Sequence, residues 1–391
     1  MMPGVRKQVY LSGGTLDIGV TAGDTDIDRL CGYASRENRK RRFLFVSKVL
    51  GKHWPVRPSV MRDVYQLLAS HLTDLPGPIL FIGMAETATG LGQGIYDALL
   101  RQTGRDDVLF IHTTRYHTSR QAAFDFQEIH SHATDHLLYL PETELGKTIF
   151  ASARSVVISD DEISTGTTIL NLLNQYRKIN GGIKEARLAS LTNWLGDLRK
   201  QELTQALHPI KLKFADILQG NFTFTANESF EISNEVDVRG GVGNKDRFFP
   251  INWGRFGVTG IPAIDFNCFT DACAFSRKDR ILILGSGEFT YPPFLFAEHL
   301  EKEGHDVFFQ STTRSPILRG NDISSIIRFT DNYGDGIPNF VYNVRREDYS
   351  RIVVCYEHSE LPPEHTLPQI LDALPLFFAW TCNETIPVSR P

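Results

Sequence analysis

Residues 156–168 read VVISDDEISTGTT, and this stretch decides the fold. Its apolar start is typical of a buried strand, and two adjacent carboxylates, Asp160 and Asp161, stand near the end of that strand. A turn of small polar residues follows, before the helical spacing of the apolar residues in 169–173. Strands that alternate with helices in this way predict an α/β fold, with a parallel sheet flanked by helices.

The turn in this stretch predicts a phosphate site. Backbone amides and hydroxyls gather at the start of the helix, where free N–H donors and the helix dipole favour an anion. Asp160 and Asp161 are placed to accept hydrogen bonds from two vicinal hydroxyls, as on a ribose. An ordinary strand–turn–helix with a capping Ser or Thr is the alternative, but capping does not explain the paired acids. The predicted phosphate-binding residues are Ser164, Thr165, Gly166, Thr167 and Thr168.

The same run resembles the loop of type I phosphoribosyltransferases that binds 5-phosphoribosyl 1-pyrophosphate (PRPP). Glu162 departs from the family pattern, in which an apolar residue is common. The resemblance implies that ribose 5-phosphate is transferred from PRPP to an unknown base or base-like acceptor, with release of pyrophosphate. It implies catalytic roles for Asp160, Asp161 and Arg115. It also implies Mg²⁺ as the cofactor, held mainly by PRPP and water rather than by identified protein ligands.

Two other strand ends fit the same site. A strand predicted over residues 78–82 ends in a glycine-bounded turn, which by resemblance is the pyrophosphate loop, Met84, Ala85, Glu86 and Thr87. A strand over 108–112 ends near Arg115, which matches the family's basic residue that meets the pyrophosphate; a solvated arginine is the alternative. Ligands of parallel sheets bind beyond the carboxyl ends of the strands, so we expect these loops to meet.

Residues 117–135 are polar and short of core residues. The resemblance places here the flexible loop that closes over PRPP and excludes water, with Glu128, His130 and His132 in it. Three histidines and two acids in residues 128–136 leave a metal site as the alternative.

The length of 391 residues predicts two domains, because it exceeds what one core usually supports. We expect an N-terminal extension and candidate hood at 1–58, a phosphoribosyltransferase domain at 59–235, a Gly/Arg-rich boundary region at 236–270 and a second domain at 271–391. The basic run at 36–42 is expected to be a solvated loop, with a phosphate-facing loop as the alternative.

The second domain is predicted to be Rossmann-like, with strands at 280–284, 306–310 and 351–356. NAD binding is rejected, since the glycine pattern fails at Pro292-Pro293 and the second strand ends near Arg314 rather than at an acid. Residues 313–316 read TRSP and, with residues 285–289, resemble the TRSP domain. That domain is the C-terminal partner of a phosphoribosyltransferase-like family encoded beside tellurium-resistance proteins, which implies a role in making a nucleotide-like metabolite.

The strand ends of this second domain predict a second anion site, because hydroxyls and an arginine suit a phosphate or carboxylate. A purely structural role for the domain is the alternative. The candidate residues are Gly285, Ser286, Gly287, Glu288, Thr313, Arg314, Ser315 and His358.

Composition points to small-molecule chemistry. There are 41 basic and 46 acidic residues, so no basic excess suggests a nucleic-acid partner, and no apolar run is long enough to span a membrane. The five cysteines form no C-x-x-C pair and are expected to be reduced. We expect a cytoplasmic enzyme, with a homodimer as the assembly to be tested. A PRPP- or nucleotide-sensing binding protein without turnover is the alternative.

Overall fold

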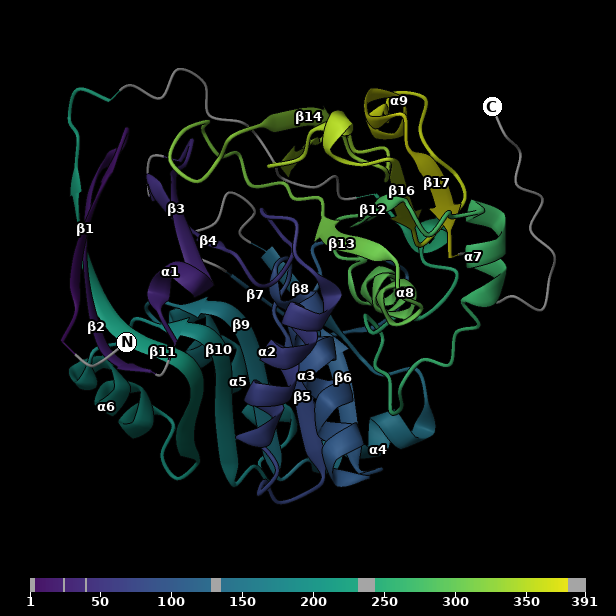
Figure 1. Ribbon diagram of the computed structural model, residues 1–391. Coiled ribbons are helices and arrows are strands. Elements are labelled where there is room, and N and C mark those ends of the chain that lie inside the picture. The colour runs from purple at the N-terminus through teal and green to yellow at the C-terminus, as the bar shows by residue number, and fades with distance from the viewer. Residues whose placement is uncertain (1–3, 24, 39–40, 128–134, 231–242, 379–391) are drawn as a thin grey trace.

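The computed structural model describes residues 4–23, 25–38, 41–127, 135–230 and 243–378. Its main sheet has seven strands in the order β1-β2-β11-β10-β9-β5-β6 (Figure 1). The strands from β11 to β6 are parallel, whereas β1 and β2 extend the sheet in antiparallel fashion. Their bounds are β1 (Arg6–Leu11), β2 (Gly14–Gly23), β5 (Ile79–Gly83), β6 (Val108–His112), β9 (Ser155–Ile163), β10 (Glu185–Asn193) and β11 (Lys211–Ala226).

Helices cover both faces of this sheet, which confirms the predicted α/β fold. Helices α2 (Pro58–Ser70) and α3 (Ala88–Thr103) lie on one face, and α4 (Glu144–Ser152) and α5 (Thr167–Ile179) on the other (Figure 1). Helix α6 (Asp197–Ala206) packs against β11. Strands β5 and β6 are buried along their whole length, which is why they read as continuous apolar runs.

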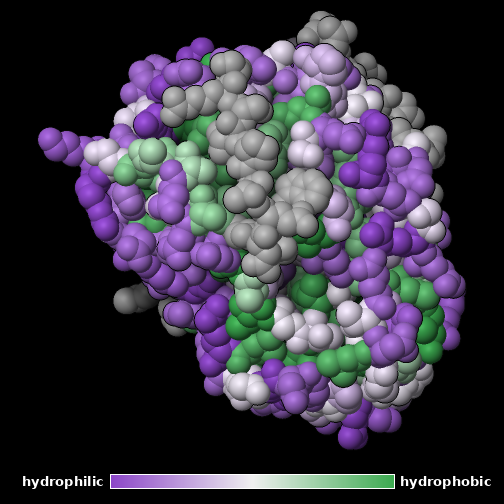
Figure 2. Space-filling model, turned by 90° about the vertical axis from the view of Figure 1, so that its right-hand side faces the viewer, coloured by the Kyte–Doolittle hydropathy of each residue, from purple (hydrophilic) through white to green (hydrophobic). Residues whose placement is uncertain are grey.

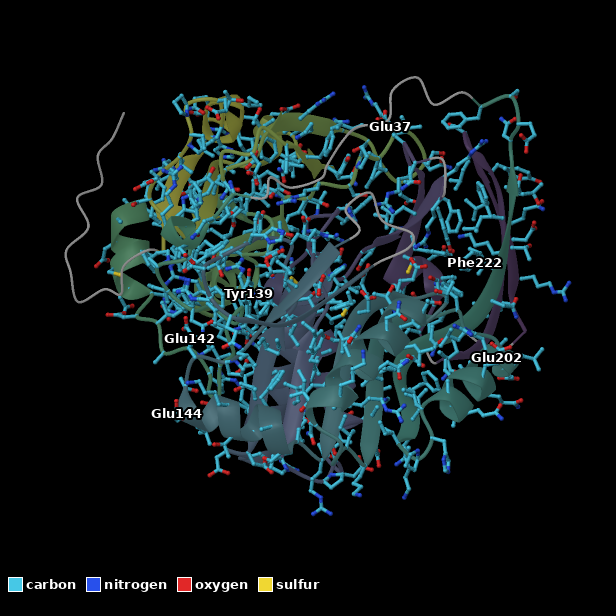
Figure 3. All side chains as sticks on the ribbon, turned by 180° about the vertical axis from the view of Figure 1, so that it is seen from behind. Glu37, Tyr139, Glu142, Glu144, Glu202 and Phe222 are labelled. Carbon is cyan, nitrogen blue, oxygen red and sulfur yellow. The ribbon has the colours of Figure 1, made fainter. Side chains whose placement is uncertain are left out.

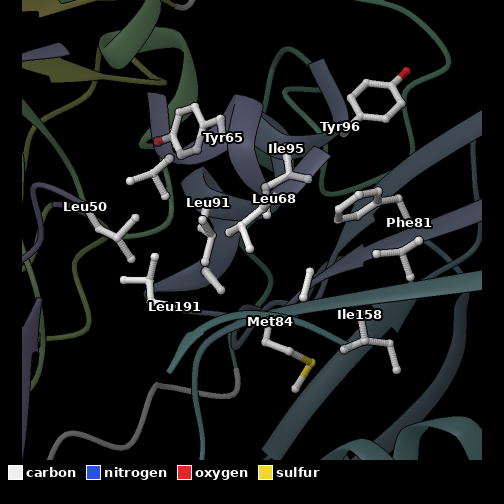
Figure 4. Close-up of a cluster of buried hydrophobic side chains, with 14 of the residues drawn as sticks. Leu50, Tyr65, Leu68, Phe81, Met84, Leu91, Ile95, Tyr96, Ile158 and Leu191 are labelled. Atoms are coloured by element: carbon white, nitrogen blue, oxygen red, sulfur yellow. The ribbon is translucent and has the colours of Figure 1, made fainter. Parts of the chain in front are cut away.

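Helices α2 and α3 approach closely over the sheet. A Cβ atom on Gly94 would lie 2.3 Å from the Tyr65 ring, so this position of α3 accepts only glycine without movement of its neighbours. Figure 4 shows Tyr65 and Leu68 of α2 with Leu91 and Ile95 of α3, above Phe81 and Ile158 of the sheet. Met84 joins the same cluster, so the first residue of the predicted pyrophosphate loop is anchored in the core.

A second, four-stranded sheet confirms the predicted Rossmann-like domain. Its order is β13-β12-β16-β17 and all its pairings are parallel. The strands are β12 (Arg280–Gly285), β13 (Asp306–Ser311), β16 (Arg351–Tyr356) and β17 (Leu374–Phe377), and the helices α7 (Asn267–Cys273), α8 (Tyr291–Lys302) and α9 (Leu367–Leu371). A hairpin of β14 (Ile326–Thr330) and β15 (Pro338–Tyr342) and the 3₁₀ turns η1 (Asp246–Phe248) and η2 (Arg346–Asp348) complete this half.

The N-terminal segment is more regular than the sequence predicted. Strands β1 and β2 belong to the main sheet, and α1 (Ile27–Leu30) leads into a hairpin of β3 (Cys31–Ser35) and β4 (Phe43–Ser47). Phe45 of this hairpin stacks on Trp194 with ring centroids 4.7 Å apart, and Phe222 of β11, labelled in Figure 3, packs against both rings. The hairpin also meets the second domain, through a bridge between Arg36 and Ile317.

The structure differs from the loop predicted for residues 117–135. Residues 122–127 form β7 (Ala122–Gln127), and β8 (Asp135–Tyr139) pairs with it in antiparallel fashion. The polar composition of 117–135 concealed a short alternation of aromatic and polar residues, in which Phe124 and Phe126 lie 6.1 Å apart.

The Gly/Arg-rich segment after β11 lies between the two halves of the molecule. Phe248, Phe249 and Phe256 form a buried cluster with aromatic residues of both halves. Arg255 lies within 3.1 Å of both Glu288 and Glu357 of the second domain, with only 3 % of its side chain exposed. The predicted domain limits stay a prediction, but the two halves share this buried junction.

Hydrophilic residues dominate the face of the molecule shown in Figure 2, and hydrophobic residues gather in its lower half. Within the described ranges, no helix is long and apolar enough to cross a lipid bilayer.

Cys31, Cys273 and Cys355 are free and buried, but the prediction of a reduced thiol is wrong for Cys268, which is disulfide-bonded.

Replacing Arg255 with alanine should lower the free energy of unfolding by about 3–5 kcal/mol, because it leaves two buried carboxylates without their cation. Arg247→Ala is the matched control. The Arg247 side chain is 69 % exposed and its ion pair with Glu360 spans 3.7 Å, so its loss should cost less than about 1 kcal/mol. Urea unfolding of both variants measures the difference, and equal midpoints would contradict the assigned role of Arg255.

Candidate functional site

Strand register brings the three predicted loops to one edge of the main sheet. Gly83 of β5 pairs with Ser159 of β9 on one side and with His112 of β6 on the other. The Met84 amide donates to the Ser159 carbonyl at 3.0 Å, which places the pyrophosphate loop beside Asp160. The chain runs from β5 outward to β6 and later returns to β9 on the opposite side, so this edge is a topological switch point, where open α/β sheets bind ligands.

The predicted phosphate loop lies at the start of α5. Gly166 precedes the helix with φ +67°, a conformation that favours glycine, and a Cβ atom there would also press on a Leu203 methyl group at 2.6 Å. The first amides of a helix lack intrahelical acceptors, and they point toward the turn. Arg199 of α6, which is ion-paired with Glu202 at 2.9 Å, donates to the Thr165 carbonyl at 2.8 Å and to Thr167 Oγ1 at 3.3 Å. These groups are suited to an anion.

The paired carboxylates lie in the last residues of β9. The Asp161 amide donates to Asp160 Oδ1 at 3.0 Å, and Arg41 from the N-terminal segment pairs with Glu162. Burial, followed by the charge of Glu162, raises the pKa of Asp161 to about 6. The expectation of a solvated basic run is therefore wrong for Arg41, whose side chain is only 20 % exposed. Arg41 neutralises Glu162, the acid that stands where the family commonly has an apolar residue.

The predicted pyrophosphate loop is held by the ends of β6 and β9. Besides the Met84 bond to Ser159, the Ala85 amide donates to Thr113 Oγ1 at 2.8 Å. Two of the four loop amides are therefore already bonded, and the loop offers those of Glu86 and Thr87 to a ligand.

The Glu86 carboxylate lies among cations from both halves of the chain. Lys52 Nζ is 2.7 Å from Glu86 Oε1, and Arg314 Nε is 3.9 Å from Oε2. Burial alone would raise the pKa of Glu86, but the charges of Lys52 and Arg314, with that of Arg115, hold it below its usual value. Glu86 is therefore an anion at neutral pH, and Arg314 lies at the pyrophosphate loop of the first domain.

Arg115 and Glu288 lie where the strand ends of the two sheets meet. The Arg115 amide donates to Glu288 Oε1 at 3.0 Å, and Thr114 Oγ1 donates to Glu288 Oε2 at 2.6 Å. Thr89, in the first turn of α3, contacts Thr290 Oγ1 at 3.1 Å and donates to the Glu288 carbonyl. Burial would raise the pKa of Glu288, but Arg255 holds it below its usual value. Glu288 thus accepts bonds from protein groups of the junction.

The residues of the predicted second anion site do not all come together. The Gly287 amide donates to Thr312 Oγ1 at 2.8 Å, the Ser315 amide to Thr313 Oγ1 at 3.2 Å, and the turns that contain Gly285 to Glu288 and Thr313 to Ser315 lie side by side. His358 instead lies against Phe248, with its Nε2 atom 3.0 Å from Asn332. Burial lowers the pKa of His358 to about 3, so it is neutral.

The flexible-loop residues Glu128, His130 and His132 lie outside the described residues. Over the ranges that are described, no group of three His, Cys, Asp or Glu side chains is arranged to hold a metal ion. Asp160 and Asp161 lie on β9 shortly before the phosphate loop, and carboxylate oxygens are hard ligands of the kind Mg²⁺ prefers.

Sequence reasoning missed four cations that shape this region. Lys52 contacts the pyrophosphate loop, and Arg41 contacts the acidic end of β9. Arg199 contacts the phosphate loop, and Arg255 pairs with Glu288 at the junction of the two halves. Lys52 and Arg41 belong to a segment without strong periodicity. Glu162 could have indicated such a cation, because an acid at a usually apolar position of a buried strand needs a positively charged partner.

Two family models match this chain, one in each half. Residues 30–221 match the family model described as phosphoribosyl transferase, and residues 253–374 match the one described as the TRSP domain, C-terminal to that transferase. Together the two matches cover more than half of the chain. A comparison with curated proteins found no match.

Among solved structures, the chain is similar to several adenine phosphoribosyltransferases. The enzyme of Rhodothermus marinus DSM 4252 has 14 % identity over 49 % of this chain and 96 % of that one, with a TM-score of 0.32. The Trypanosoma brucei enzyme, in complex with AMP, pyrophosphate and ribose-5-phosphate, has 12 % identity over 54 % and 86 %, with a TM-score of 0.35. The Giardia lamblia enzyme, with 9-deazaadenine, has 15 % identity over 51 % and 98 %, with a TM-score of 0.32.

The Asp161 carboxyl should titrate with a midpoint near pH 6 in the free protein, as followed by the NMR shift of its side-chain carbonyl carbon. Glu162→Gln should move this midpoint to lower pH, because it removes a charge that disfavours the Asp161 anion and leaves that of Arg41. The exposed Glu144 offers the matched control, Glu144→Gln, which should leave the midpoint in place. A midpoint near 4 in the unmodified protein would contradict the burial of this group.

Proposed function

The chain carries a phosphoribosyl transferase domain followed by a TRSP domain, and we propose that it transfers ribose 5-phosphate from PRPP to a base or base-like acceptor, releasing pyrophosphate. The observation that carries the proposal is the pairing of Gly83 with Ser159. This register sets the acidic strand end and phosphate loop directly beside the loop at Met84. The spacing suits a ligand with a phosphate at one end, ribose hydroxyls in the middle and a pyrophosphate at the other.

In the proposed complex the 5-phosphate binds the turn from Ser164 to Thr168, near the charge of Arg199. The ribose hydroxyls donate to Asp160 and Asp161, and the pyrophosphate lies on the loop from Met84 to Thr87 near Arg115. This placement is supported by the phosphate-binding character of a helix N-terminus and by the position of all three loops at one sheet edge.

The reaction breaks the bond between the ribose C1 atom and a pyrophosphate oxygen, and the bonding electrons leave with the pyrophosphate. A nucleophilic atom of the acceptor forms the new bond to C1. Positive charge develops on the sugar in an oxocarbenium-like transition state, so the residues of the site act by orienting PRPP and stabilising the departing anion. No side chain needs to act as a nucleophile.

The expected Mg²⁺ fits the residues present. Asp160 and Asp161 provide carboxylate oxygens near the sugar, and PRPP and water would provide the remaining ligands, since Mg²⁺ keeps several waters. When bound, the ion offsets charge on the pyrophosphate. The finer expectations, a nucleotide-like product and an association with tellurium resistance, stay predictions.

Changing both Asp160 and Asp161 to asparagine should weaken PRPP binding more than about tenfold, because a hydrogen bond to a charged group contributes about 1.5–3 kcal/mol and 1.4 kcal/mol is tenfold in affinity. Calorimetry with Mg²⁺ and PRPP measures this. Asp63→Asn, on the exposed side of α2, is the matched control and should leave affinity unchanged. Unaltered affinity in the double variant would remove the assigned ribose site.

An assay of pyrophosphate release from PRPP, run with a panel of candidate nitrogen acceptors, distinguishes transfer from binding alone. The proposal expects release that requires both Mg²⁺ and one acceptor class, and that the double asparagine variant loses. PRPP binding without release for any acceptor, in a panel that covers purines, pyrimidines and their ring-opened analogues, would favour the PRPP-sensing alternative.

A further inference from the structure

Arg314 is a buried cation whose terminal nitrogens are poorly satisfied by the part of the chain that the structure describes. Its side chain is 7 % exposed, and among the described residues neither Nη1 nor Nη2 has a hydrogen-bond partner. A buried guanidinium with unmet donors is costly unless an anion meets it. Its surroundings therefore call for a ligand.

The carboxylates near Arg314 are each closer to another cation. Glu86 is 2.7 Å from Lys52 but 3.9 Å from Arg314, and Glu288 is 3.1 Å from Arg255. Lys52, by contrast, is fully engaged, since Nζ also donates to the carbonyls of Gly287 and Thr312 at 3.3 and 2.8 Å. Arg314 therefore adds a positive charge here that no carboxylate pairs with closely, beside the charge of Arg115.

The TRSP turn holds Arg314 in place. The Ser315 amide donates to Thr313 Oγ1 at 3.2 Å, and Tyr342 donates its hydroxyl to the Ser315 carbonyl at 2.6 Å. The guanidinium lies over the Tyr116 ring, with its central carbon 4.8 Å from the ring centroid. A planar cation that is already fixed on an aromatic face loses little further conformational freedom when a ligand binds. This favours bidentate recognition of a phosphate.

The position of Arg314 identifies the anion. It lies beside Glu86, in the same loop that the proposed function gives to the pyrophosphate, and two of the four amides of that loop are already bonded within the protein. A pyrophosphate there needs donors beyond the remaining amides of Glu86 and Thr87. Arg314 offers two unused nitrogens on the second domain's side of the same loop.

We infer that the TRSP domain completes the transferase site, with Arg314 binding the pyrophosphate group of PRPP opposite the loop from Met84 to Thr87. The inference rests on the proposed function and replaces a separate second anion site in the TRSP domain with one shared site. It explains why the TRSP turn directs its arginine toward the first domain. It also makes the second domain necessary for binding the leaving group, and not for binding the sugar phosphate.

The test compares three probes on the full chain by calorimetry: PRPP and inorganic pyrophosphate, each with Mg²⁺, and ribose 5-phosphate. Arg314→Ala should weaken pyrophosphate and PRPP about tenfold or more and leave ribose 5-phosphate unchanged, since a charge-assisted bidentate contact is lost only at the pyrophosphate end. Arg314→Lys should fall between, as lysine keeps the charge without the planar fork. Arg319→Ala, an exposed arginine five residues further on, is the matched control and should bind all three probes normally.

The outcomes separate this inference from the proposed function. Pyrophosphate and PRPP affinities that stay normal in Arg314→Ala, or a chain that never binds pyrophosphate, overturn the shared site. Equal loss of all three probes in Arg314→Ala, with unfolding at lower temperature, also overturns it, because Arg314 then supports the fold. Failure of the unmodified chain to bind both PRPP and ribose 5-phosphate is different, since it removes the proposed function itself.

Discussion

The burial of charge at the meeting of two parallel sheets is the constraint on which the rest of the structure depends. Arg255 is placed between Glu288 and Glu357, and Lys52 connects Glu86 to two carbonyls of the second domain. These side chains are almost entirely buried, so each charge needs a protein partner at a fixed position. The two domains are therefore held in one relative arrangement by ionic contacts as well as by the aromatic cluster around Phe248 and Tyr333.

This arrangement connects fold to function. In a single parallel sheet, the carboxyl ends of the strands form an open crevice. Here the ends of β12 and β13 lie over that crevice on the side of β5 and β6, with Glu288 against Thr114 and Arg314 toward Glu86. The side toward β10 is bordered by the β3–β4 hairpin, where Phe45 stacks on Trp194. The two sides of the crevice are therefore bordered by different parts of the chain, the TRSP domain on one side and the N-terminal hairpin on the other.

The sequence predicts the strands near the site well, but it predicts the side-chain contacts of the site less well. The runs at 79–83, 108–112 and 156–158 are buried on both faces, so their apolar character alone reveals them, and parallel order then places Met84 beside Asp160. Residues 122–127 read as a loop in the sequence because Phe126 is the one buried residue among 122–126, which leaves little apolar character to indicate a strand. Lys52 and Arg41 act through partners 34 and 121 positions away, which no local pattern encodes. The prediction of a separate anion site stays untested, but it was made without knowing that the turn with Arg314 would lie beside Glu86 of the first domain.

A structure of the chain with Mg²⁺ and a non-hydrolysable PRPP analogue tests the central claim most directly. The account predicts the 5-phosphate on residues 164–168, the ribose hydroxyls at Asp160 and Asp161, and the pyrophosphate oxygens within hydrogen-bond distance of both Thr87 and Arg314. A pyrophosphate group that lies on the loop at Met84 but beyond the reach of Arg314 would contradict the shared site. An analogue bound anywhere else on the molecule would contradict the account as a whole.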